Sequence, residues 1–214
     1  MPGSRETKVT IVIVPRERFS YALASLDSVL SNTSTPYRLV YVDTDSPIKL
    51  RRALKQRSHD YGFKLIRTSH FLTPNEARNL GMRHADTPFV AIMDNDVHCA
   101  PGWLENLLRC AEETGAAVVS PVITSGPVSE AGPDFETVHA IGGEVGFYER
   151  DGVRGHYERS GYSMAKLDRF SIFWPGARWR LPNSIACWFV ATRGTSLAAS
   201  TKDSRIRVST PTSA

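Results

Sequence analysis

Two carboxylates that stand two residues apart, in Asp94-Asn95-Asp96, are the side chains of this sequence best suited to chemistry. They directly follow an apolar run, Phe89 to Met93, so both can converge on one cation where a buried strand ends. Mg²⁺ and Mn²⁺ prefer oxygen ligands and share them readily with phosphates. A metal held there would neutralise charge on a departing diphosphate. Acidic triplets also occur by chance in turns. The secondary structure around this triplet therefore determines how strongly it indicates a metal site.

A third carboxylate, Asp43, follows another apolar run, Tyr37 to Val42. At a strand end it can accept a hydrogen bond from a nucleobase N–H or a ribose hydroxyl. It can equally cap the helix that follows, and we weigh the two interpretations evenly. For Asp45 we prefer the helix cap, and we interpret His98 as an incidental loop histidine rather than a metal ligand.

The first loop of the chain, Pro15-Arg16-Glu17-Arg18, contains no glycine. Dinucleotide sites and P-loops need glycine at this point so that the backbone can approach phosphate. Both kinds of site are therefore disfavoured. A nucleotidyltransferase, which usually carries a Gly-rich basic loop after its first strand, is a weaker alternative for the same reason.

Strands that alternate with helices must position these residues. The β-branched run 9–14 predicts a strand buried on both faces, and further strands are predicted at 37–42, 63–66, 89–93 and 116–119. Ser46-Pro47 and the capping box Thr73-Pro74-Asn75-Glu76 predict helix starts, and Gly62 and Gly115 predict helix ends. The alternation over residues 9–123 predicts a doubly wound, mostly parallel α/β sheet. Ligands bind such sheets at the carboxyl ends of the strands.

Four features in this order resemble the family-2 nucleotide-sugar glycosyltransferases of the GT-A fold. They are the start VTIVIVP, the aspartate after the second strand, the stretch Asn75-Glu-Ala-Arg-Asn-Leu-Gly81, and the run FVAIMDND. The resemblance covers roughly residues 8–123. It implies a GT-A-like (Rossmann-like) fold and inverting transfer of a sugar from a nucleoside diphosphate, UDP or dTDP, to the hydroxyl of a saccharide, lipid-linked or other acceptor.

The resemblance also implies roles for individual residues. Asp94 and Asp96 would serve Mn²⁺ or Mg²⁺ and the diphosphate, and Asp43 would face a uracil or thymine base. The nucleotide-binding residues implied as a set are Pro15, Asp43, Arg78, Asn79, Asp94 and Asn95. Helix packing and surface charge are the alternative for Arg78 and Asn79. The chain departs from the family at Pro15-Arg16-Glu17, where a small or hydroxyl residue and an aromatic often follow the proline.

Beyond residue 123 the pattern changes. We predict one domain over residues 1–191, in which 8–123 form the nucleotide-sugar-binding half and 124–191 an irregular, partial acceptor-side extension. The Ser/Thr-rich residues 192–214 predict a disordered or aberrant tail.

The resembling family takes its catalytic base from a second acidic motif before a final helix. After residue 124 no Asp-Asp, Glu-Asp or Glu-x-Asp pair precedes a helical pattern. We therefore expect the base to be missing together with the C-terminal part of the domain, and sugar transfer to be poor. Glu149 or Asp151 folding back as the base is the alternative. A catalytically dead sugar-nucleotide-binding protein is the alternative function.

The composition is that of one globular domain, with 214 residues, 41% hydrophobic and 22% charged. No apolar run approaches the ~20 residues that span a bilayer, and the first run is too short for a signal peptide. Three cysteines without CxxC spacing fit a reducing compartment. We therefore expect a cytoplasmic protein.

The net charge of +4 suits an anionic nucleotide or a membrane surface, which leaves peripheral membrane association open. The densest basic stretch lies on one predicted helix and is favoured as a solvated face over a binding patch. It comprises Lys49, Arg51, Arg52, Lys55 and Arg57. No motif indicates nucleic-acid binding.

Overall fold

The computed structural model describes residues 6–16, 18–125, 128–129, 132–133, 137–162, 165–166 and 187–191. The chain divides into two compact units, one drawn from residues 1–119 and 187–214 and the other from residues 120–186. The predicted tail, 192–214, lies outside the described residues.

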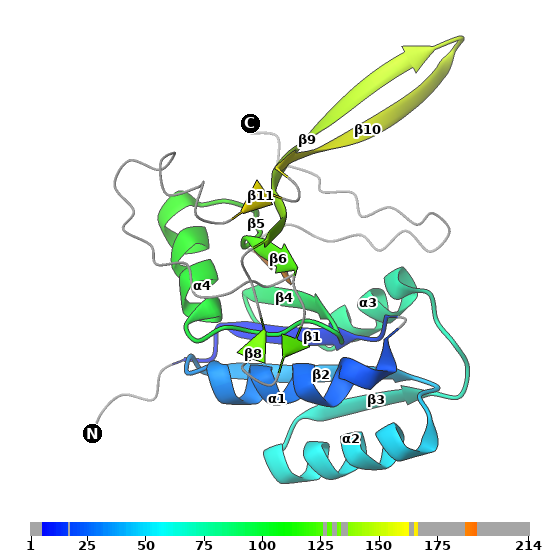
Figure 1. The fold of residues 1–214 in the computed structure, drawn as a ribbon, viewed down its shortest axis with the longest axis vertical. Coiled ribbons are helices and arrows are strands. Elements are labelled where there is room, and N and C mark those ends of the chain that lie inside the picture. Colours follow the sequence, from blue (N-terminus) through cyan, green and yellow to red (C-terminus); the bar gives the residue numbers. More distant parts are fainter. Residues whose placement is uncertain are drawn as a thin grey trace. The chain divides into compact units, whose positions relative to one another are not determined.

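A six-stranded sheet with the order β3-β2-β1-β4-β12-β5 forms the first unit (Figure 1). Its parallel strands are β1 (Val9–Val14), β2 (Tyr37–Thr44), β3 (Lys64–Thr68) and β4 (Phe89–Asp94). Strand β12 (Cys187–Ala191) runs antiparallel to β4 and to β5 (Val118–Val119). The predicted α/β, mostly parallel sheet is confirmed.

The direction of strand addition reverses between β1 and β4. From β1 the chain proceeds outward to β2 and β3, then crosses back to place β4 on the other side of β1. Ligands of open α/β sheets bind outside the carboxyl ends of the strands at such a switch point. The loops after Val14 and Asp94 flank it.

The helices follow the predicted order. They are α1 (Ala22–Asn32), which the 3-10 turn η1 (Phe19–Tyr21) precedes, α2 (Ile48–Tyr61), α3 (Pro74–Met82) and α4 (Trp103–Thr114). Helix α3 packs on the sheet face formed by alternate valine and isoleucine side chains of β1, β2 and β4. At Gly81 a Cβ would lie 2.3 Å from a Val12 methyl group, so only glycine permits this close helix–sheet approach.

Most predicted helix ends are confirmed. Glu76 N–H donates to the Thr73 hydroxyl at 3.4 Å and Thr73 N–H donates to the Glu76 carboxylate at 2.8 Å, which completes the capping box. Gly62 and Gly115 end their helices at φ of 68° and 66°. The predicted N-cap at Ser46 is wrong. Pro47 is the N-cap of α2 and no side chain caps this helix, because the Ser46 backbone is held by Asp43 instead.

The second unit contains a regular hairpin, so the expectation of an irregular extension is wrong for this part. Strand β9 (Thr137–Arg150) pairs with β10 (Val153–Tyr162), β6 (Ile123–Ser125) and β11 (Ala165–Lys166). Short strands β7 (Val128–Ser129) and β8 (Gly132–Pro133) pair with each other. The hairpin turns at Asp151-Gly152, with φ of 53° and 76°. Positive φ at both positions is what a two-residue hairpin loop requires, and Asp-Gly is a strong signal for it.

Candidate functional site

The Asp94 carboxylate lies at the carboxyl end of β4 with both of its oxygens engaged. Arg78 of α3 donates to Oδ1 at 2.8 Å, and Arg16 donates to Oδ2 at 3.0 Å. Asp94 is 12% exposed and Arg78 24%, whereas Arg16 is 57% exposed. Arg78 is therefore more than a surface charge of the helix, because its ion pair with Asp94 connects α3 to the switch point. Arg16, noted in the sequence only as a departure from a family pattern, is its counterpart from the loop after β1.

Asn95 links the two loops at the switch point. Its side chain is buried, and its Oδ1 accepts a hydrogen bond from the Arg16 backbone N–H at 2.9 Å. Its buried Nδ2 has no hydrogen-bond partner among the described residues. Pro15, which precedes Arg16 in the chain, is also buried. Asn95 thus holds the first loop against the acidic triplet.

Asp96 differs from Asp94 in having no partner. It is half-buried, and no side chain or backbone group in the described part of the chain bonds to its carboxylate. His98 follows nearby in the sequence, and burial lowers its pKa, which favours the neutral imidazole. The Nε2 of His98 is buried with no hydrogen-bond partner among the described residues.

A divalent cation fits this site only with help from a ligand. The described residues hold no cluster of three or more His, Cys, Asp or Glu side chains that could bind a metal by itself. Mg²⁺ is commonly bound by one or two carboxylates plus substrate phosphates, so Asp96 with a diphosphate matches that chemistry. Asp94 would first have to release an arginine.

Asp43 is buried at the end of β2, with 1% of its surface exposed. Its Oδ1 accepts the Ser46 N–H at 3.1 Å, and its Oδ2 accepts a hydrogen bond from Arg67 at 2.5 Å. Arg67, which the sequence reasoning missed, also reaches Asp45 at 3.4 Å. Neither aspartate caps α2, so the helix-cap interpretation is wrong for both. Asp43 anchors the loop instead.

Asp45 has a positive φ of 55°, which is uncommon for a residue other than glycine. Asn79, on α3, is half-buried, and its backbone carbonyl accepts the Arg83 N–H at 3.3 Å. No described group bonds to the Asn79 side chain, and its predicted nucleotide contact stays a prediction.

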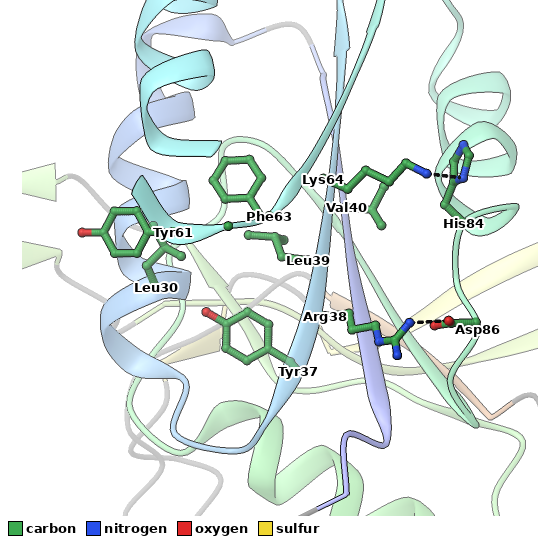
Figure 2. A pocket seen from close by; sticks show the side chains of 11 residues that line it. Leu30, Tyr37, Arg38, Leu39, Val40, Tyr61, Phe63, Lys64, His84 and Asp86 are labelled. Atoms are coloured by element: carbon green, nitrogen blue, oxygen red, sulfur yellow. Dashed lines mark hydrogen bonds and ion pairs between the residues drawn. The ribbon is translucent and has the colours of Figure 1, made fainter. Parts of the chain in front are cut away.

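A cavity of about 520 Å³ lies at the opposite edge of the sheet (Figure 2). Its lining residues come from α1, from the amino ends of β2 and β3, from the end of α2, and from the segment that follows α3. Figure 2 shows ion pairing between Arg38 and Asp86 and a contact between Lys64 Nζ and His84 Nδ1, which are 2.9 Å apart. Because ligands of such sheets bind at the carboxyl edge, this cavity is separate from the candidate site.

The acids considered as a base lie in the second unit. Glu149 and Asp151 form a Glu-x-Asp pair at the tip of the β9–β10 hairpin, and among the residues that the structure describes no helix follows this pair. Glu149 pairs with Arg154 at 3.0 Å, and Asp151 lies 3.8 Å from Arg150. Both carboxylates are exposed. Glu130, Asp134, Glu136, Asp168 and Asp203 lie outside the described residues.

Among the described residues, no helix has both the length and the apolar character needed to cross a membrane.

Comparison with known proteins identifies the family of this chain. Residues 10–174 match the family model "Glycosyl transferase family 2". The chain is 30% identical over 125 residues to polypeptide N-acetylgalactosaminyltransferase 15 of Homo sapiens, which covers 56% of this chain and 19% of that protein. It is 32% identical over 128 residues to the pre-mycofactocin glycosyltransferase of Mycobacterium tuberculosis, with 58% and 25% covered.

The matched region thus spans about a fifth to a quarter of the length of these relatives. Among solved structures, a mannosyltransferase from Pyrobaculum calidifontis in complex with GDP-Man and Mn²⁺ superposes with a TM-score of 0.50 at 22% identity. The superposition covers 57% of this chain and 37% of that one. That likeness shows the fold.

Proposed function

Since the chain belongs to glycosyl transferase family 2, we propose that it binds a nucleoside-diphosphate sugar at the carboxyl edge of β1, β2 and β4. The sugar passes, with inversion, to an acceptor hydroxyl. The observation that carries this proposal is the charge arrangement at the switch point. Two arginines converge on Asp94, while Asp96, two residues on, has no partner among the described residues.

That arrangement suits a diphosphate. Guanidinium groups form bidentate, charge-assisted hydrogen bonds with phosphate oxygens. Arg16 is more than half exposed and carries several donors, so it can turn from Asp94 to a phosphate. Arg78 is braced by Asn75 at 3.2 Å as well as by Asp94, so it is the better-fixed of the two.

Asp96 is the residue that would hold a divalent cation, with Asp94 joining it if an arginine moves to the phosphate. When bound, Mn²⁺ or Mg²⁺ would supply Lewis-acid neutralisation of charge on the leaving diphosphate. The Mn²⁺ and GDP-Man of the Pyrobaculum mannosyltransferase support the choice of a cation and a nucleotide sugar. This chain's own carboxylates support it independently.

We further propose that the base is a pyrimidine and that Asp43 accepts its N–H. Each carboxylate oxygen has more than one lone pair, so the bonds to Ser46 and Arg67 leave capacity for another donor. The base reaches it only if the buried carboxylate becomes accessible from the loop after β2.

Calorimetric titration with UDP, dTDP and GDP, each with and without Mn²⁺, tests the donor site. We expect tighter binding of a pyrimidine diphosphate in the presence of Mn²⁺. The matched variants are Asp96→Ala and Glu105→Ala. Glu105 accepts hydrogen bonds from the Ser34 region, away from the switch point.

Asp96→Ala should abolish the Mn²⁺-dependent part of the UDP affinity without unfolding the protein, because it removes the one triplet carboxylate that has no partner among the described residues. Glu105→Ala should keep that dependence. Unchanged Mn²⁺-dependent binding in Asp96→Ala would contradict the assignment of Asp96 as a metal ligand. If no diphosphate binds, the proposed donor site is wrong.

A further inference from the structure

The outward face of helix α2 is basic, and among the described residues its charges contribute no contact that stabilises the fold. Leu50 and Leu54 are buried, and they define the inward side of the helix. With 3.6 residues per turn, four exposed cations spread over the outward half. They are Lys49, Arg51, Arg52 and Lys55.

Within the described part of the chain, the side chain of none of these four residues forms an ion pair or hydrogen bond. A fifth basic residue, Arg57, does have a partner, because it makes two hydrogen bonds of 2.9 Å to Asp27 of α1. The basic character of α2 is thus divided between one structural ion pair and a face of four unpaired charges.

The position of two of these charges opposes helix stability. Lys49 and Arg51 occupy the beginning of α2, which has no acidic residue in its first turn and no side-chain cap. The helix macrodipole is positive at this end and favours negative charge there. Cations at this position therefore raise an already positive potential. An external anion would relieve it.

The residue at the centre of the basic face is apolar. Ile48, which is 52% exposed, lies between Arg52 and Lys55 around the helix. His59 lies on the same side of the helix one turn beyond Lys55 and is exposed, but residues 48–59 contain no Trp, Tyr or Phe. Such aromatic platforms are a usual feature of single-stranded nucleic-acid sites. Cations around a lone exposed aliphatic residue suit a lipid headgroup layer better than RNA.

We propose that the α2 face of Ile48, Lys49, Arg51, Arg52 and Lys55 docks the protein on an anionic membrane surface. The attraction is electrostatic, since the apolar side of α2 is already buried in the protein. Near an anionic bilayer each Lys or Arg contributes about fivefold in affinity, the equivalent of ~1 kcal/mol per charge. The face includes none of the proposed donor residues, although α2 begins five residues after Asp43, and the inference does not depend on the proposed function.

The test uses the whole chain and phosphatidylcholine vesicles with and without about one third phosphatidylglycerol. We expect co-sedimentation with the anionic vesicles alone, weakening as salt rises because exposed charges are screened. Arg52→Gln with Lys55→Gln should weaken binding by about 25-fold, from two charges at fivefold each. The control, Arg83→Gln with Arg109→Gln, makes the same change in net charge at exposed positions of α3's end and α4.

The control pair should lose far less binding than the α2 pair. Equal losses would overturn the assignment to α2, and no binding of the unmodified chain to anionic vesicles would overturn the proposal. Tighter binding to a poly(U) oligonucleotide than to the vesicles would assign the face to nucleic acid instead. Thermal unfolding checks that each variant folds, and UDP titration of the same variants separates this result from the donor site.

Discussion

At the residue scale, the acidic triplet of this chain divides into three different roles. Asp94 is neutralised by Arg16 and Arg78, Asn95 ties two loops together, and Asp96 has no partner among the described residues. Sequence reasoning placed Asp94 and Asp96 together on a metal. The geometry makes Asp96 the more accessible ligand for a cation. At Asp94 a cation would have to compete with two guanidinium groups, and at Asp96 it would not.

Only one of the arginines at this site could be predicted from the sequence. Arg78 stands in a recognisable stretch, whereas Arg16 and Arg67 do not. Arg67 reaches Asp43 because β2 and β3 pair in a register that sets these two residues opposite each other. The register of a parallel pair is determined by packing over the whole sheet rather than by neighbouring residues, so this contact had no local signal.

Asp43→Ala tests base recognition. If Asp43 accepts a pyrimidine N–H, the variant should lose ~1.5–3 kcal/mol of UDP binding, the range for hydrogen bonds to charged groups. Titration with UDP and with pyrophosphate should show a much smaller loss for pyrophosphate.

The matched control is Arg67→Met, which removes one anchor of Asp43 but keeps its carboxylate. If Asp43 reads the base directly, UDP should bind Arg67→Met better than Asp43→Ala. Equal losses in the two variants, and for both ligands, would show that Asp43 acts only as the anchor of its loop.

At the element scale, the sequence predicted what is decided locally. Continuous β-branched runs formed the parallel strands. The Thr73 capping box begins α3 and Gly62 ends α2, as expected. The start of α2 was misplaced by one residue because Asp43 holds the Ser46 backbone. The hairpin was missed although Asp151-Gly152 is a local signal, since the frequent glycines around it suggested irregular structure.

Glu76 makes the stability of α3 depend on pH. Hydrogen bonds from the Thr73 side chain and backbone lower the pKa of this carboxyl. A lowered pKa in the folded state contributes stability above the unfolded value of about 4.3, and this contribution is lost as pH falls through the folded pKa. Glu76→Gln can keep the capping geometry but not the charge.

We therefore expect urea unfolding midpoints of the original chain and Glu76→Gln to converge as pH is lowered from 6 to 3. Asp60→Asn, a change at an exposed carboxylate in the last turn of α2, is the control. Parallel pH profiles for the original chain and Glu76→Gln would contradict the assignment.

Gly81 sets the distance between α3 and the sheet. A methyl group there overlaps Val12, and overpacking costs about 1–3 kcal/mol. Alanine returns about 0.8–1.0 kcal/mol of helix propensity, so Gly81→Ala should lower the free energy of unfolding by up to roughly 2 kcal/mol. Chemical denaturation measures it, with Lys55→Ala on the exposed face of α2 as control. A more stable Gly81→Ala protein would show that the helix shifts freely.

At the scale of the whole molecule, family membership covers residues 10–174, while the described candidate site draws only on the first unit. The acids Glu149 and Asp151 belong to the other unit and already pair with neighbouring arginines. Donor binding by this chain can therefore be tested separately from sugar transfer.

We expect the 214-residue chain to bind a donor but to transfer sugar poorly, because no acidic pair after residue 124 precedes a helical pattern. General-base catalysis is worth about 10²–10⁴-fold. Radiolabelled donors with a panel of hydroxyl acceptors measure turnover. Robust transfer that disappears in Glu149→Gln or Asp151→Asn, but survives in Glu144→Gln, would prove this expectation wrong and identify the base.

Strand β12 has a consequence for how the protein is made. It inserts between β4 and β5, yet 67 residues separate it from β5 in the chain. At ribosomal rates of about 5–20 residues per second, roughly 3–14 s pass between synthesis of β5 and arrival of β12. During that interval β4 presents an unpaired, apolar edge, the kind of surface on which chains aggregate. The nascent first unit is therefore a natural client for a chaperone that binds exposed strands.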